Sequence, residues 1–312
     1  MAQSKTRRFT NDHQREFVKL FDAACQRHNR WSVFADFVHM AAIAISNTVD
    51  KVHAEEREKT YMQMAGQYNK KELECFARML SEIVEGLEID PDQDLLGNLF
   101  MNLDLGNQHR GQFFTPYNVS KMMAEVSIAT DDLAGRIEKL GWMGVNDCAG
   151  GAGGLLIAFA NVCMRYGVNF QRSVLFTAQD VDTTAACMCY LQLSLMGCPG
   201  YVCIANTLTK PCLCLDKRAL IPAPNQDIWY TPLYFMTEWH YRRIWAKMDM
   251  LLESASSAEN KDFPPTPPVK PKMAKKPKVS KPPEEAPEDV KAEPEPVQVT
   301  LAETKTGQLT FF

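Results

Sequence analysis

The sequence lacks the bulk features that point directly to a nucleic-acid-binding, secreted or membrane protein. Its 34 basic and 38 acidic residues leave a formal net charge of −4, so no overall basic field marks it. No apolar run approaches the roughly 20 residues that span a bilayer. Residues 1–10 are polar and basic without the apolar core of a secretory leader. We therefore expect a cytoplasmic protein without a membrane partner, and any contact with DNA would need a local basic patch.

A disulfide framework and a zinc site are also disfavoured, although the chain has ten cysteines. Many cysteines lie in apolar runs such as AACMCYLQLSLMGC, which suits reduced and buried thiols. The pairs Cys187-x-Cys189 and Cys212-x-Cys214 lack the CxxC-like spacing usual in structural zinc sites. Small core residues are the favoured interpretation, and we expect no metal site.

Four stretches of different character follow one another along the chain. Residues 1–105 repeat apolar residues at spacings of three and four, which predicts a helical N-terminal domain. Residues 106–253 alternate predicted strands and helices, as in a mostly parallel, doubly wound α/β sheet. Residues 254–300 hold most of the prolines and blocks of lysine and acid, which predicts a disordered linker. Residues 301–312 end in the apolar stretch GQLTFF.

A glycine-rich stretch, DCAGGAGGLL at residues 147–156, separates a predicted strand from a predicted helix. Glycine permits a tight turn and lets backbone N–H groups approach a ligand at the helix N-terminus. The stretch is neither G-x-G-x-x-G nor a P-loop, because no lysine follows the glycines. Asp180 ends the next predicted strand, which would put a carboxylate beside the turn at ribose distance. Tight packing of the turn, and helix capping by Asp180 or Asp182, are the structural alternatives.

Four motifs in order resemble the adenine-N6 DNA methyltransferases. They are GQFFTP at residues 111–116, the glycine-rich stretch, a strand ending in QD, and ANTL. The resemblance is strongest to the modification subunits of type I restriction-modification systems and their phage or plasmid relatives, and it covers roughly residues 106–235. Relative to the family's DPACGSGG, the frame is kept by Asp147, Gly151, Gly153 and Gly154, and the replaced positions are Cys148, Gly150 and Ala152.

The resemblance implies a Rossmann-like methyltransferase sheet and S-adenosylmethionine as cofactor. The aromatic segment and the glycine turn would enclose the methionine end, Asp180 would accept from the ribose hydroxyls, and Asn206 would lie near the adenine. Such a zwitterionic sulfonium ligand needs backbone donors and acids rather than lysine. The implied cofactor-binding residues are Gln112, Phe113, Phe114, Thr115, Pro116, Tyr117, Asp147, Gly151, Ala152, Gly153, Gly154, Asp180 and Asn206.

The catalytic motif of the family, [ND]-P-P-[FY], is absent, and its nearest match is TPLY at residues 231–234. The resemblance implies Thr231, Pro232 and Tyr234 as catalytic residues acting on a flipped adenine. A threonine hydroxyl is shorter than the family's amide or carboxylate, and losing one transition-state hydrogen bond costs on the order of 10²–10³ in rate. Two functions therefore stay open: a DNA methyltransferase, and a degenerate relative that binds cofactor or DNA. Methyl transfer to RNA or protein is a third, weaker hypothesis, and a strand end with packed aromatics is the structural alternative.

Partners follow from what surrounds these motifs. The short remainder before the linker leaves no room for a target-recognition region, so sequence recognition would need the helical part or a specificity subunit. Arginines and aromatics in this remainder could touch DNA, although aromatics at helical spacing are more often core. These residues are Trp239, Tyr241, Arg242, Arg243 and Trp245.

The last stretch, GQLTFF, resembles the peptide by which bacterial proteins bind the sliding clamp. The resemblance implies that Gln308 enters a small subsite and that Leu309, Phe311 and Phe312 fill an apolar groove. On a long tether such an anchor would act through effective concentration. The alternative is a tail that docks on its own domain.

Overall fold

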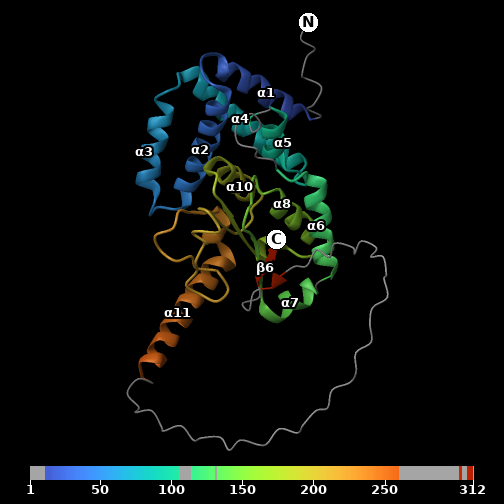
Figure 1. The fold of residues 1–312 in the computed structure, drawn as a ribbon, viewed down its shortest axis with the longest axis vertical. Coiled ribbons are helices and arrows are strands. Elements are labelled where there is room, and N and C mark those ends of the chain that lie inside the picture. The colour runs from blue at the N-terminus through green and yellow to red at the C-terminus, as the bar shows by residue number, and fades with distance from the viewer. Residues whose placement is uncertain are drawn as a thin grey trace, which may run out of the picture. The chain divides into compact units, whose positions relative to one another are not determined.

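The computed structural model describes residues 11–103, 105, 114–130, 132–259, 302–303 and 308–311 (Figure 1). Met1–Lys247 and Leu301–Phe312 form one compact unit, and Met248–Thr300 form a second. The helices are α1 (Asp12–Ala24), η2 (Cys25–Arg27), α2 (Arg30–Val49), α3 (Ala54–Ala65), α4 (Lys70–Ile89), α5 (Leu95–Asn102), α6 (Tyr117–Thr130), α7 (Leu133–Leu140), α8 (Gly154–Arg165), α9 (Phe170–Ser173), α10 (Thr183–Leu195), η3 (Pro232–Phe235) and α11 (Thr237–Glu259). The strands are β1 (Met143–Asp147), β2 (Val174–Asp180), β3 (Gly200–Ile204), β4 (Ile228–Tyr230), β5 (Ala302–Glu303) and β6 (Gln308–Phe311).

The N-terminal helices begin where the sequence supplies caps. The side chain of Asn29 accepts hydrogen bonds from the first turn of α2. At α4, Asn69 and Glu72 form a reciprocal capping box, which satisfies two backbone donors that a helix start leaves unpaired. The apolar faces of α1 and α4 pack on each other, with Phe17 and Met79 fully buried. This confirms that the N-terminal region is helical.

The N-terminal helices share one core with the sheet, so residue 105 marks a change of secondary structure within a compact unit. The buried guanidinium of Arg57 on α3 donates to the backbone carbonyl of Ile228, 2.9 Å away, and lies 4.0 Å from the Trp229 ring centroid. A second contact joins α5 to α10, where the amide oxygen of Gln192 accepts from the backbone N–H of Leu96 at 3.0 Å. These contacts attach α3 and α5 to the α/β part.

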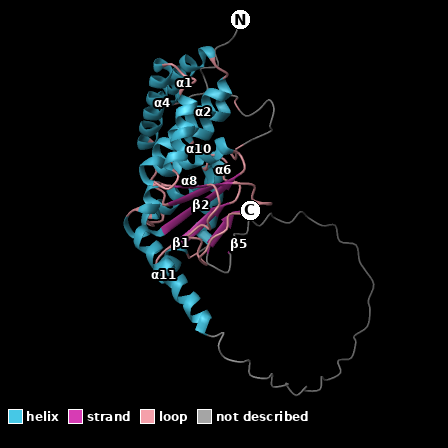
Figure 2. Ribbon diagram, turned by 90° about the vertical axis from the view of Figure 1, so that its left-hand side faces the viewer, coloured by secondary structure: helices cyan, strands magenta, loops and turns pink. Residues whose placement is uncertain are grey.

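The sheet has the strand order β4-β3-β2-β1-β6-β5, with β1, β2 and β3 parallel. Helices α8 and α10 connect these strands and pack on each other, and α10 also packs on α2. In both views, α8 and α10 lie between the N-terminal helices and the strands (Figure 2). Because β1 and β2 run parallel, the turn after Asp147 and the residue Asp180 fall at the same edge of the sheet. The predicted α/β class is confirmed.

The fourth strand, β4, runs antiparallel to its neighbour β3. A catalytic motif after this strand would lie beside the glycine turn only if the strand ran parallel to the others. β4 pairs antiparallel with β3, and Tyr230 lies opposite Tyr201. A parallel return needs a crossover, usually a helix. Residues 205–227, all described, contain none, so the chain turns back along β3. Residues that follow β4 therefore lie at the amino end of the parallel strands.

The C-terminal segment occupies the free side of β1. β6 pairs parallel with β1, from Gly144 opposite Gln308 to Asp147 opposite Phe311, and β5 pairs antiparallel with β6. The structure thus has the tail docked on its own domain, which was the alternative to a clamp-binding peptide. Gln308, Leu309 and Phe311 lie in β6, and Phe312 falls outside the described residues.

Helix α2 is long and apolar enough, by length and composition alone, to cross a membrane. Its apolar side chains are occupied within the fold, since Val33, Phe37, Val38 and Ala42 are buried against neighbouring elements. A core helix of a globular unit has this composition as well.

Candidate cofactor-binding site

The glycine turn between β1 and α8 adopts backbone conformations that favour glycine. Gly151 and Gly153 have φ values of +52° and +92°, in the left-handed region. Gly153 is the N-cap of α8, and the N–H of Gly150 donates to the carbonyl of Gln179 at 3.0 Å. A Cβ on Gly151 would lie 2.9 Å from the Phe114 ring, and one on Gly153 would lie 2.9 Å from the Cys189 sulfur. Conformation and close packing thus both require glycine at these two positions.

Asp180 is held against the turn by two backbone donors. Its Oδ2 accepts from the N–H of Gly151 at 2.8 Å, and its Oδ1 accepts from the N–H of Asp182 at 2.9 Å. A carboxylate has about four acceptor sites, so both oxygens retain capacity for a further donor. Asp182 caps α10 through the N–H of Ala185. The capping alternative thus applies to Asp182, while Asp180 faces the glycine turn as the spacing of the βα units predicted.

A cavity of about 350 Å³ opens beside the turn, within the size range of small-molecule sites. Three of its lining residues are acids, and none of the described lining residues is basic. The cavity is therefore electrostatically suited to a ligand with positive charge. It is lined by Asp94, Phe114, Thr115, Ser120, Met123, Asp147, Cys148, Ala149, Gly150, Gly151, Ala152, Gly154, Leu155 and Asp180.

Burial raises the pKa of Asp147 and that of Asp94. Burial raises the pKa of Asp147 to about 6, with the charge of Asp180 adding to the effect and the N–H of Ala149 opposing it. Burial also raises the pKa of Asp94, against hydrogen bonds from Gln192 and Gly97. Among the described residues, no basic side chain forms an ion pair with either acid. Two buried carboxyls without a counter-ion would be stabilised in their charged form by a cationic ligand.

Asp94 belongs to none of the sequence motifs, and the fold brings it to the cavity from outside the glycine-rich unit. Asp94 caps α5, and its Oδ1 also accepts from the amide nitrogen of Gln192 at 2.8 Å. The same amide nitrogen donates to the carbonyl of Ala152 at 2.8 Å, so Gln192 ties the cap to the turn. A Cβ on Gly154 would lie 3.0 Å from Asp94, which shows how closely α8 begins against this carboxyl. The capping pattern predicts the helix start but not its position at the cavity.

Ser120 on α6 is a second cavity residue that the sequence motifs do not include. Its side chain is fully buried and lines the cavity, and its hydroxyl has no hydrogen-bond partner among the described residues. Buried hydroxyls are almost always paired, because leaving one unpaired costs about 1–3 kcal/mol. An unpaired hydroxyl facing a cavity is a donor that a ligand or an ordered water can use. No signal in the sequence distinguishes Ser120 from other helical serines.

The aromatic segment ahead of α6 reaches the cavity in part. Phe114 and Thr115 line it, and the Phe114 ring packs on Phe100 with centroids 5.3 Å apart. Pro116 directly precedes the first residue of α6. The hydroxyl of Tyr117 donates to Asp92 at 2.8 Å, and Tyr117 is not among the lining residues. Gln112 and Phe113 lie outside the described residues.

Asn206 lies at the correct edge of the sheet but uses its side chain locally. The residue follows β3, and the neighbouring Thr207 hydroxyl donates to the carbonyl of Cys148 in the glycine turn. The side-chain oxygen of Asn206 accepts from the N–H groups of Leu208 and Thr209, at 3.0 and 3.1 Å. The loop therefore contacts the turn, while the Asn206 amide caps its own loop and is not among the residues that line the cavity.

The predicted catalytic segment is not at this site. Thr231 is 0% exposed, and its hydroxyl donates to the carbonyl of Cys198 at 2.7 Å and accepts from the N–H of Gly200 at 2.9 Å. Gly200 is the first residue of β3, whereas the glycine turn follows the last residue of β1 and Asp180 is the last residue of β2. This placement corrects the prediction that Thr231 faces the cofactor, because β4 runs antiparallel.

The other two predicted catalytic residues stay with Thr231. Pro232 begins η3. Tyr234 is buried, stacks on Tyr230 with ring centroids 4.8 Å apart, and donates its hydroxyl to the carbonyl of Leu220. The strand end with packed aromatics, which was the structural alternative, describes this segment.

The predicted DNA-contacting residues near the start of α11 divide into packed and exposed groups. Trp239 is fully buried and donates its indole N–H to the carbonyl of Gln171. The guanidinium of Arg242 lies 4.4 Å from the Trp239 ring centroid, and that of Arg243 lies over the Tyr234 ring. By contrast, Tyr241 and Trp245 are 65% and 63% exposed.

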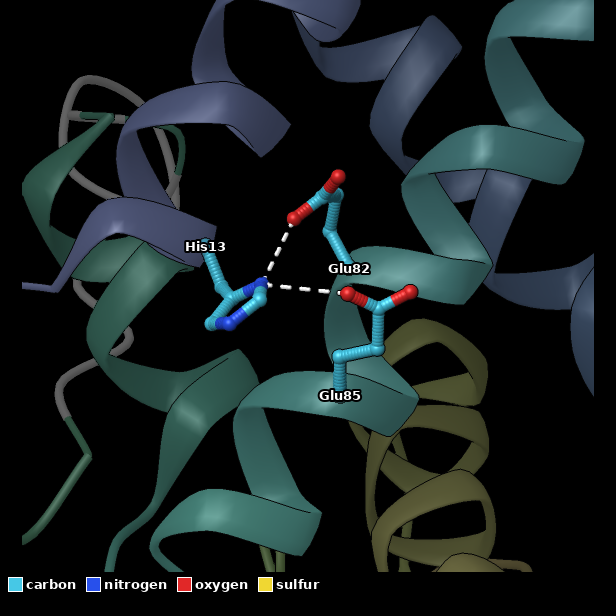
Figure 3. Close-up of side chains that lie close together, drawn as sticks. All are labelled: His13, Glu82 and Glu85. Carbon is cyan, nitrogen blue, oxygen red and sulfur yellow. Dashed lines mark hydrogen bonds and ion pairs between the residues drawn. The ribbon is translucent and has the colours of Figure 1, made fainter.

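Among the described residues, one group of three side chains that could bind a metal lies close together, away from the cavity. It consists of His13 on α1 with Glu82 and Glu85 on α4 (Figure 3). The Nδ1 of His13 lies 2.8 Å from Glu82 and 3.7 Å from Glu85. The contact joins two packed helices. Cys187 and Cys189, considered earlier for zinc, are buried within α10.

Comparisons with known proteins concern mainly the α/β part. A sequence model of the family described as N-6 DNA methylase matches residues 95–259, just over half of the chain. A comparison with curated proteins finds no match. Among the solved structures that match, two have low similarity to this chain. A protein assigned to the class I S-adenosylmethionine-dependent methyltransferases, from Listeria monocytogenes, has a TM-score of 0.38 and 16% identity over 66% of this chain and 57% of its own.

The second solved structure is a type I restriction-modification system methyltransferase subunit from Streptococcus thermophilus. It has a TM-score of 0.35 and 17% identity, over 65% of this chain and 46% of its own. The chain thus spans less than two thirds of either protein.

Proposed function

The chain belongs to the N-6 DNA methylase family, and from this premise we propose that its acid-lined cavity binds S-adenosylmethionine and that its methyl acceptor is the exocyclic amine of adenine in DNA. The observation that carries the proposal is the cavity itself. It joins the glycine turn, a ribose-type acceptor in Asp180, and, within the described part of the chain, two buried acids without a counter-ion and an unpaired hydroxyl. When bound, the cofactor supplies a methyl group on a positively charged sulfur.

Each group at the cavity has a counterpart in this cofactor. Asp94 and Asp147 would stabilise its ammonium and sulfonium charges, because neither buried acid forms an ion pair with a basic side chain of the described residues. Ser120 would donate to its carboxylate, and the remaining acceptor sites of Asp180 would take the ribose hydroxyls. The absence of lysine from the described lining fits a ligand without phosphate.

The test of the proposal separates binding from transfer. Titration calorimetry with S-adenosylmethionine measures binding to the cavity. Incubation with methyl-labelled cofactor and double- or single-stranded DNA, followed by nucleoside analysis, measures transfer to adenine. Label in N6-methyladenine supports both parts of the proposal, whereas binding without label on any DNA rejects the second part. Competition with RNA and protein substrates tests the other amine acceptors.

The burial of Thr231 favours a second candidate function, a family member that binds cofactor or DNA without transferring the methyl group. Among the described residues, the cavity lining presents carboxylates and backbone groups but not the amide-Pro-Pro-aromatic arrangement of the family. Such a relative would modulate a restriction-modification or replication-associated system. Cofactor binding without transfer is its expected signature.

Replacing Thr231 distinguishes a structural role from a catalytic one. Thr231→Val leaves the Gly200 N–H and the Cys198 carbonyl unpaired, so we expect a loss of about 1–3 kcal/mol in unfolding free energy and an unchanged cofactor affinity. Thr231→Asn, which restores the family residue type, should destabilise the protein without increasing methyl transfer. Chemical denaturation and calorimetry measure these effects. A stable Thr231→Asn variant with increased transfer would contradict the structural role.

The affinity for S-adenosylmethionine should fall as pH decreases through about 6, where Asp147 becomes protonated and loses its attraction for a cation. Between about pH 7.5 and pH 5 we expect a weakening on the order of tenfold, measured by calorimetry. Asp147→Asn should bind more weakly at the higher pH and lose most of this dependence. An unchanged pH profile in that variant would contradict the assignment.

The contribution of Asp147 to the stability of the free protein changes with pH in the opposite direction to the affinity. Its folded pKa is raised above the ordinary value of 3.8, so its favourable contribution is full below that value and is lost as pH rises through about 6. Denaturation of the free protein at the two pH values therefore separates a general loss of structure from the expected loss of binding.

Ser120→Ala should weaken cofactor binding without weakening the free protein. Removing an unpaired buried hydroxyl costs no internal hydrogen bond, so the unfolding temperature should stay the same or rise. Binding should weaken about tenfold, for one lost hydrogen bond to a charged carboxylate. The matched control is Ser127→Ala on the same helix, where the hydroxyl donates to the carbonyl of Met123. That variant should lower stability and keep the affinity, and the reverse pattern would contradict the role of Ser120.

The partners proposed for this function are DNA and, for target recognition, a specificity subunit. The exposed Tyr241 and Trp245 on α11 offer stacking surfaces for DNA or contact area for such a subunit. A sliding clamp would compete with β1 for Gln308–Phe311. Crosslinking at Trp245 and pull-down with the tail peptide test these assignments.

A further inference from the structure

Strand β1 carries the glycine turn, and each of its two sides is paired with a different strand. One side pairs with β2, from the same α/β unit. The other pairs with β6, a strand from the far end of the sequence, over the four residue pairs from Gly144–Gln308 to Asp147–Phe311. β5 covers the outer side of β6 at Ala302 and Glu303. A short two-stranded segment thus separates the central strand of the site from the edge of the sheet.

This pairing bears directly on the cavity. Asp147, the last β1 residue paired with β6, is also a cavity acid and the residue from which the glycine turn starts. Without β6, the N–H and C=O groups on that side of β1 would form an open strand edge, which invites fraying or pairing with another chain. Within the sheet, Asp147 would then be paired with β2 alone.

We infer that the outer side of β1 is a strand-docking site, that its occupant is this chain's own strand β6 with β5 beside it, and that the docked strand holds the glycine turn in its cofactor-binding form. Capture of the GQLTFF segment by another protein would then lower the affinity of the cavity for its ligand. The docking itself is independent of the cofactor's identity. The effect on affinity rests on the function proposed above.

The docking is tested by hydrogen exchange on the full-length chain. Because β6 lies between β1 and β5, its backbone N–H groups serve one neighbour or the other, and a proline removes one of them. In Thr310→Pro, peptides that contain Met143–Asp147 should exchange at least about tenfold faster than in the wild type. Peptides from α4 should stay protected, which shows that the unit remains folded. The control variant, Ala292→Pro, introduces a proline into the segment that precedes β5 in the sequence. It should leave hydrogen exchange in β1 unchanged.

A synthetic peptide with the sequence of residues 301–312 supplies the second arm. Added to a chain truncated after residue 300, it should restore β1 protection, and it should restore calorimetric affinity for S-adenosylmethionine. Equal β1 exchange in wild type, Thr310→Pro and the truncated chain would overturn the docking. A wild-type dimer that dissociates on truncation would identify a second copy as the donor and also overturn it. Restored protection without any cofactor binding, in the wild type included, would support the docking and reject the proposed function instead.

Discussion

Gly153→Ala is expected to destabilise the protein by about 3 kcal/mol and to abolish measurable cofactor binding. Gly153 has a φ of +92°, and a non-glycine residue in the left-handed region costs about 1–2 kcal/mol. Its new Cβ would lie 2.9 Å from the sulfur and 3.3 Å from the Cα of Cys189, so the helix backbone of α10 would have to move, which adds about 1–3 kcal/mol. Denaturation and calorimetry measure the two effects.

Gly167→Ala is the matched control for the backbone term. Gly167 has a φ of +75°, but a Cβ there meets no atom within 4 Å. We expect this variant to lose only about 1–2 kcal/mol and to bind the cofactor normally. In the double variant Gly153→Ala, Cys189→Ala, part of the packing cost should be recovered because the sulfur is gone. Equal losses in Gly153→Ala and Gly167→Ala would show that packing against α10 does not constrain the turn.

Asp180→Ala is expected to weaken the binding of S-adenosylmethionine at least about 100-fold. The substitution removes the acceptors proposed for the ribose hydroxyls, and hydrogen bonds to a charged group contribute about 1.5–3 kcal/mol each. It also leaves the N–H groups of Gly151 and Asp182 unpaired, which loosens the glycine turn. Calorimetric titration measures the change, with denaturation as the check on folding.

The neighbouring acid provides the control for this variant. Asp182→Ala removes the N-cap hydrogen bond to Ala185 and should cost about 1 kcal/mol of stability. Its cofactor affinity should stay within about threefold of the wild type, because Asp182 is not among the cavity residues. If both variants weaken binding to the same extent, the assignment of Asp180 to the ribose is wrong.

The α/β part of the site could be predicted from sequence because its geometry follows from connectivity. In a strand-turn-helix-strand unit with parallel strands, the turn after Asp147 and the end of β2 at Asp180 must lie at one edge. The glycines mark the backbone positions that side chains cannot occupy. Local pattern and chain topology specify the same arrangement here.

The placement of Thr231 shows what local pattern does not encode. The sequence pattern predicts alternating strands and helices here, with a strand end and packed aromatics as one interpretation of TPLY, but the direction of a strand depends on the connection that precedes it. Residues 205–227 form no crossover helix, so β4 returns antiparallel and carries Thr231 to the amino end of β3. The lack of helical periodicity in that connection was the available signal.

Ser120 and Asp94 could not be predicted for a different reason. Each belongs to a helix outside the glycine-rich unit, and only tertiary packing brings it to the cavity. The sequence leaves open whether the tail binds another protein or its own domain, because a short apolar segment looks the same whether its acceptor is a partner or the chain's own strand β1.

Calorimetric titration of S-adenosylmethionine into the full-length protein at about pH 7.5 tests the central claim, that the acid-lined cavity binds this cofactor. Saturable binding of one ligand per chain is expected, lost in Asp180→Ala and retained in Asp182→Ala. Absence of binding to folded wild-type protein, or equal binding by all three proteins, would contradict it.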